Sequence, residues 1–341
     1  MLQDRNYKKE VILWIIRWQD FLSKRFRSKI VASVSMFFIP IMVTGFVLED
    51  KYDYGILSYR VFVSLLWVAI APFLIQSALD YVYNFFHNYK HLFRSQEDWE
   101  TLLRGETRRF QSSKSLLFGL PWATVTSGVI VFCAFNRAPF LIQVWAGVSF
   151  FILFLVSSIG FYGVFVLLTM MNKILPENIS FNPYHPDKFG GISEFGRFSV
   201  KVSLYFSSGA LVFPLAFEII DKMHKGPNLL NVSIYLLAGF FLCVMFASFL
   251  VPIFQIKNFV DPIKEKIILE ARSELDKMVN EFKANQDFHI KQALEILMHY
   301  YFNYSKLLEL KDYPWDLRVL LEYSLSFAIP IAVAIFQIFF K

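Results

Sequence analysis

Seven long runs of apolar residues constrain the fold of this chain more than any other feature. They lie near residues 30–48, 61–79, 115–134, 140–158, 202–220, 231–253 and 319–340. An α-helix rises about 1.5 Å per residue, so about 20 apolar residues cross the hydrocarbon core of a bilayer. A transmembrane β-strand would instead show alternating polarity over about ten residues. The runs therefore predict an all-α, polytopic transmembrane helical bundle of about seven spans.

The positions of lysine and arginine predict the orientation of these spans. Residues 1–29, 80–114, 172–201 and 254–318 fall on one side of the membrane and hold 28 of the 34 basic residues. Cytoplasmic loops carry such an excess, so we expect a cytoplasmic N-terminus, an external C-terminus and a multi-pass protein of the plasma or inner membrane. The net charge of +6 suits anionic lipid headgroups. No sequence signature of a nucleic-acid-binding fold is present, and no nucleic-acid partner is expected.

The chain divides into three parts on this basis. Residues 1–256 form a transmembrane region of six spans, preceded by an interfacial helix near residues 11–22 that places Trp14 and Trp18 at headgroup level. Residues 257–318 are charged and helix-rich, and they form a cytoplasmic helical insert. Residues 319–341 form the last span.

The insert reads as two amphipathic helices with a change of phase between them. Asp261-Pro262 is typical of a helix start. The first apolar seam includes Ile268, Leu275, Met278 and Phe282, and the second includes Leu294, Leu297 and Tyr301. A single coiled coil keeps one phase, so a break or hairpin near residue 285 is expected. The seams bury against each other, against another subunit, or against a cytoplasmic protein partner; the sequence leaves these open.

The loop at residues 176–200 is the most distinctive stretch outside the spans. It contains His185, Asp187, Gly190 and Gly191, and the two glycines can adopt positive φ and approach a ligand closely. We interpret it as a gating or ligand loop at the cytoplasmic entrance; a proline-rich surface connection is the alternative.

Ionisable residues are nearly absent from the centres of the spans, which disfavours proton-coupled and ion-coupled transporters. The polar character of the spans comes from small hydroxyl residues, such as Thr126, Ser207 and Ser208. Prolines within the spans, including Pro214 and Pro330, loosen the helices locally. These residues either line a narrow pore or serve helix packing.

A metal site is a weaker alternative. His87 and His91 are spaced i, i+4 on an expected helix, and His185 and Asp187 lie on the same side of the membrane. No established metal-binding motif supports such a site, and no cofactor is expected.

Three functions follow from these features. The first is a homo-oligomeric channel or pore-like protein with a cytoplasmic helical element for assembly and gating. The second is a membrane-anchored signalling or effector module that acts through its insert. The third is a polytopic enzyme with a His/Asp site at the cytoplasmic face.

Overall fold

The computed structural model is all-helical, without β-strands, in the part of the chain that it describes, and short turns and loops connect the helices. That part comprises residues 13–53, 59–88, 105, 109, 112–178, 182–185, 187–209, 228–284 and 290–310, with positions 321, 324, 328 and 332. Five of its helices are long and apolar enough to cross a membrane: Lys29–Tyr52, Val61–Asn88, Ser113–Phe132, Phe140–Lys173 and Gly239–Lys283. They overlap the first four predicted spans and the sixth, and Gly239–Lys283 continues from the sixth span into the predicted insert. The fifth and seventh predicted spans lie largely outside the described residues.

The N-terminal part forms a helical hairpin. Helix α2 (Trp14–Phe26) ends at Arg27, whose φ is 55°, and Ser28 then caps α3 (Lys29–Ser33). The Gln19 amide donates to the Ser33 hydroxyl at 2.8 Å, which holds α2 against α3. The amphipathic helix predicted near residues 11–22 is thus separate from the first span. That span continues through a π-helical segment, η1 (Val34–Phe38), into α4 (Ile39–Tyr52).

The next helices pack as antiparallel neighbours. Helix α5 (Tyr59–Asn88) precedes α7 (Ser112–Ala134), which packs along α8 (Phe140–Asn178) through the predicted short turn. Because α8 has 39 residues, it is about 58 Å long and extends beyond a bilayer, as expected from its sequence. Helix α9 (Ser193–Ser207) then lies against α5, α8 and the long helix α11.

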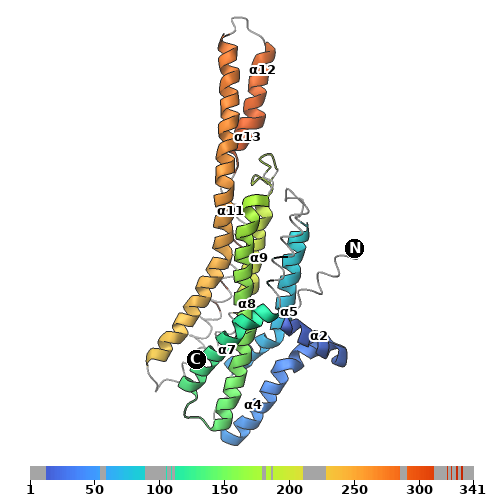
Figure 1. The fold of residues 1–341 in the computed structure, drawn as a ribbon, viewed down its shortest axis with the longest axis vertical. Coiled ribbons are helices and arrows are strands. Elements are labelled where there is room, and N and C mark those ends of the chain that lie inside the picture. The colour runs from blue at the N-terminus through green and yellow to red at the C-terminus, as the bar shows by residue number, and fades with distance from the viewer. Residues whose placement is uncertain are drawn as a thin grey trace.

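Helix α11 (Asn228–Ala284) is continuous for 57 residues, or about 85 Å. The prediction of a helix start at Asp261-Pro262 is therefore wrong, because Pro262 lies inside α11 together with Pro252. Each proline removes one backbone donor, while the helical residues on both sides keep theirs. Figure 1 shows that the N-terminal part of α11 lies oblique to the rest. The two prolines are the residues that loosen the helix in this way.

The end of α11 forms the expected hairpin with the segment that follows. After Ala284, helix α12 (Ile290–Met298) begins, and it continues through the π-helical segment η5 (His299–Tyr304) into α13 (Ser305–Leu308). Figure 1 shows α12 and α13 beside the distal part of α11, well away from α4 and α7. The break predicted near residue 285 is present.

An aromatic cluster joins α5, α8, α9 and α11 between the spans and this hairpin. Phe198 of α9 stacks on Phe85 of α5 with ring centroids 4.3 Å apart, and Phe195 meets Phe85 edge-on at 5.2 Å. Phe86 is fully buried beside them. Residues from α8 and α11, such as Met170 and Ile256, complete the same core.

We expect Phe198→Ala to destabilise the protein by about 3–5 kcal/mol, because Phe198 is only 1% exposed and its removal leaves a cavity between four helices. Thermal unfolding in detergent micelles measures this loss. Phe165→Ala, at a side chain of α8 that is 62% exposed, is the control and should change the midpoint little. Equal effects of the two substitutions would contradict the role given to the cluster.

Candidate functional site

The loop around Asp187 is organised by that one carboxylate. Its Oδ1 accepts hydrogen bonds from the N–H groups of Phe189 at 2.9 Å and Gly191 at 3.0 Å, and its Oδ2 accepts one from Ser193 at 3.3 Å. The Nδ1 atom of His185 lies 2.9 Å from Oδ1. A carboxylate accepts about four such bonds, so the hydrogen-bonding capacity of Asp187 is used within its own loop. Asp187 also places negative charge at the N-terminus of α9, where a helix dipole favours it.

These contacts alter the pKa of Asp187. Partial burial by itself raises the pKa, but the hydrogen bonds from Phe189, Gly191, His185 and Ser193 outweigh it and lower the pKa below the ordinary value of 3.8. A lowered pKa in the folded state stabilises the fold above the unfolded-state value. That stabilisation is lost as the pH falls from roughly 5 toward the lowered pKa.

The backbone of this loop adopts the positive φ angles that its glycines permit. Gly190 and Gly191 have φ angles of 70° and 89°, and Lys188 also has a positive φ of 59°. The carbonyl of Gly190 accepts from the Asn182 N–H at 3.1 Å, which closes the loop. As a result, the Phe189 side chain is buried in the aromatic cluster, whereas the Lys188 side chain is exposed. The predicted gating or ligand loop is a compact cap on α9.

Lys188 connects this cap to the hairpin. Its Nζ lies 2.8 Å from Oε2 of Glu309, which follows α13, and this contact lowers the pKa of the Glu309 carboxyl. The Lys264 ammonium of α11 donates to the carbonyl of Leu310 at 2.7 Å and secures the same end of the hairpin. The sequence carries no signal for these pairs, because their partners lie 121 and 46 positions apart. Lys188, Lys264 and Glu309 are the residues that sequence reasoning missed.

The predicted assembly seam is divided between two environments. On α11, Ile268 packs against buried Leu307 and Leu310, and Leu275 and Phe282 are half-buried, whereas Met278 is exposed. On the second limb the predicted residues face outward, and exposed positions there are Leu294, Leu297 and Tyr301. Half-buried residues on this limb include Ile296 and His299, and the His299 ring approaches Glu274 of α11 at 3.3 Å. Leu294, Leu297 and Tyr301 are therefore not on the face that closes the hairpin.

The hydroxyl residues of the spans bond to their own helices. Thr126 donates to the Trp122 carbonyl at 2.6 Å, Ser207 to Leu204 at 2.8 Å and Ser208 to Tyr205 at 2.7 Å. Such bonds satisfy the hydroxyls within one helix. Thr126 lies on α7, whereas the two serines lie at the end of α9. Two further positions named for a pore, Pro214 and Pro330, lie outside the described residues.

The four residues named for a metal site are not gathered by the described part of the chain. His87 stacks on Tyr83 at the end of α5, whereas His185 pairs with Asp187 in the loop. His91 lies outside the described residues. Among those residues, no group of three or more His, Cys, Asp or Glu side chains is arranged to hold a metal ion.

We expect Asp187→Asn to lower stability by about 1–2 kcal/mol at pH 7, since an amide oxygen replaces two carboxylate acceptors at a helix start. The difference from the wild type should shrink as the pH falls through the unfolded-state pKa toward the lowered pKa of the folded state, because the stabilisation by the ionised carboxylate is lost over that range. Unfolding midpoints between pH 7 and pH 3 test this. Asp276→Asn, at an exposed carboxylate of α11, is the control. A difference independent of pH would contradict the role of the charge.

Comparisons of the chain with models of protein families, with curated proteins and with solved structures give no match. The function proposed below rests on the residues of this chain alone.

Proposed function

We propose that the protein is a homo-oligomeric channel or pore-like protein of the plasma or inner membrane, with the hairpin as its cytoplasmic element for assembly and gating. The observation that carries the proposal is the outward apolar stripe on the second limb of the hairpin. We define the hairpin stripe as Ile290, Leu294, Leu297, Tyr301 and Leu308. Each of these side chains is more than half exposed in the single chain.

The spacing of the hairpin stripe suits a second copy of the same chain. Its first four members follow one another at intervals of four, three and four residues, which is the a/d pattern of a coiled-coil seam. The hairpin lies beyond the aromatic cluster, away from α4, α7 and the N-terminal part of α11 (Figure 1). A large exposed apolar patch in water marks an interaction surface. Symmetric oligomers cover such a surface with the same surface of another subunit.

The close packing inside one chain favours a pore that forms between subunits. The helices around α8 pack through buried aromatic and aliphatic side chains, and the hydroxyls of Thr126, Ser207 and Ser208 are bonded to their own helices. Ions require a polar or hydrated path. Because the described helices leave no such path among themselves, we place the conducting path between subunits.

The Asp187 loop gives the hairpin a connection to the spans. Lys188 contacts Glu309 at the base of the hairpin, while the neighbouring Phe189 packs with Phe195 and Phe198 of α9. A displacement of the hairpin would change the position of this loop and of α9 together. This arrangement suits a gating element, since a rigid cap transmits motion to the helix that it holds.

A membrane-anchored effector module is the second candidate, because the hairpin stripe also suits a helix of a partner protein. The channel proposal requires that the isolated protein be an oligomer, whereas the effector module can be a monomer. For the metal-dependent enzyme alternative, no group of three or more His, Cys, Asp or Glu side chains among the described residues is arranged to hold a metal ion.

The test replaces Leu294 and Leu297 by glutamate in the full-length protein. We expect the wild type to be an oligomer in lipid nanodiscs and to give ion flux in liposomes. The double variant should dissociate and lose at least tenfold in flux, because four or more glutamates would then meet in one apolar seam. Light scattering gives the particle mass, and dye-reported flux gives the activity.

The matched control places two glutamates elsewhere on the hairpin, at the exposed positions Lys277 and Lys283. It should retain both assembly and flux. A monomeric, non-conducting wild type would overturn the channel proposal and favour the effector module. An oligomer that both variants leave intact would overturn the role of the hairpin stripe.

A further inference from the structure

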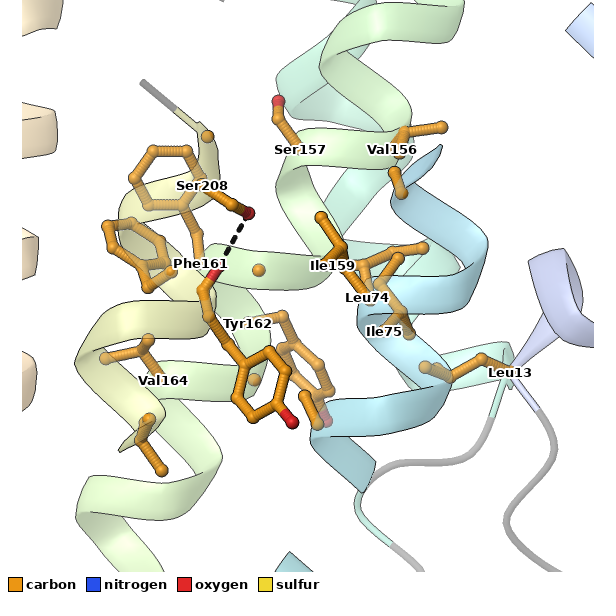
Figure 2. Close-up of a pocket in the computed structure, with 18 of the residues that line it drawn as sticks. Leu13, Leu74, Ile75, Val156, Ser157, Ile159, Phe161, Tyr162, Val164 and Ser208 are labelled. Carbon is orange, nitrogen blue, oxygen red and sulfur yellow. Dashed lines mark hydrogen bonds between the residues drawn. The ribbon is translucent and has the colours of Figure 1, made fainter. Parts of the chain in front are cut away.

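We propose that a cavity inside the bundle holds one acyl chain of a bilayer phospholipid. The cavity has a volume of about 190 Å³ and lies between α5, α8 and α9, with Phe241 of α11 at one side. Figure 2 shows Leu74 and Ile75 of α5, Ile159 of α8 and Ser208 of α9 around it. The inference rests on the lining, the size and the position of the cavity, and it does not depend on channel activity.

The described lining is almost entirely apolar and contains no charged side chain. Its hydroxyl groups already have partners within the protein. Ser157 donates to the Phe154 carbonyl and Ser208 to the Tyr205 carbonyl, at 3.0 and 2.7 Å. The Tyr162 hydroxyl donates to the carbonyl of Arg109 at 2.6 Å, and that of Tyr205 lies 2.8 Å from the Ser77 hydroxyl. The indole Nε1 atoms of Trp67 and Trp122, which also belong to the lining, have no hydrogen-bond partner among the described residues. Because every other lining contact is apolar or already satisfied, an occupant gains mainly dispersion contacts, and hydrocarbon is the chemistry that the lining favours.

The size of the cavity supports the same occupant. A cavity of about 150 Å³ lined by aliphatic and aromatic residues stays dry and takes up benzene, and this one is larger. Its lining residues on α5 run from Trp67 to Val82, about 22 Å along the helix. A flexible chain fills a space extended along a helix better than a compact ring does.

The position of the cavity identifies the source of the chain. Its walls belong to the candidate spans Val61–Asn88 and Phe140–Lys173. The outer faces of these helices present exposed apolar side chains, such as Ile70 and Phe165. A bilayer around these helices supplies acyl chains at high local concentration, whereas a soluble apolar metabolite would have to cross the same lipid first.

Gly163 offers a clean way to fill the cavity. It lines the cavity, and a Cβ atom built on it meets no heavy atom within 4 Å. A Cβ atom therefore fits here, leucine extends from it to add volume, and leucine favours the helix over glycine. Gly128 of α7 has the same free space but does not line the cavity. Gly128→Leu is thus a matched control for Gly163→Leu.

The experiment reconstitutes the full-length protein in vesicles that contain a phosphatidylcholine with a mid-chain diazirine. After illumination, mass spectrometry locates the labelled residues. We expect label on Val156, Ile159 and Val164 of α8, which are buried from bulk lipid. Gly163→Leu should reduce that label at least fivefold, while Gly128→Leu and the label on exposed Phe165 stay unchanged.

Two outcomes would overturn the proposal. One is labelling confined to exposed residues in the wild type, which would mean that no lipid chain enters the cavity. The other is equal labelling of the buried residues in the wild type and in Gly163→Leu. Unfolding midpoints of both leucine variants show whether each retains the fold. Ala78→Leu, at another lining position, fills the cavity from α5 and should reduce the label in the same way.

Discussion

The stack of Phe198 on Phe85 is the contact on which the rest of the molecule depends. It lies where helices leave the apolar region, so the same side chains fix the relative positions of α5 and α9 and, through Ile256 and Val260, of α11. Beyond this point the described residues form the two limbs of the hairpin and the loop capped by Asp187. The cluster is the last point at which α11 packs against α9 before the helix continues into the hairpin, after Phe241 and Met245 have packed against Phe206 and Phe249 against Val200. Aromatic rings serve this purpose well, because each buries a large area with few rotatable bonds.

Five of the seven predicted apolar helices and the end of α11 near residue 285 could be predicted from the sequence because each depends on local composition. A run of apolar residues long enough to cross a bilayer must form a helix in lipid, whatever its neighbours are. The change in the phase of the apolar residues near residue 285 can likewise be recognised without knowing any tertiary contact. The start predicted at Asp261-Pro262 failed because proline is compatible both with a first turn and with the interior of a long helix that is held on both sides.

The contacts of the site could not be predicted, because they join residues far apart in the sequence. Asp187 was identified as part of a distinctive loop, but its place at the start of α9 depends on the backbone N–H groups of Gly191 and Ser193. The pairing of Lys188 with Glu309 requires the position of the hairpin. The second apolar seam was recognised from its period, yet period alone does not decide which of two adjacent faces meets α11. The cavity is a property of packing and leaves no pattern in sequence.

Helix α9 belongs to both proposed sites, and this has a physical consequence. Its first residue, Ser193, is held by Asp187, its middle carries Phe195 and Phe198, and its last turn presents Tyr205 and Phe206 to the cavity. A helix moves as a rigid body over this length, so an acyl chain in the cavity and a second subunit on the hairpin would act on the same element. Energetic coupling between two sites requires such a shared element. In this chain α9 is fifteen residues long and connects the two.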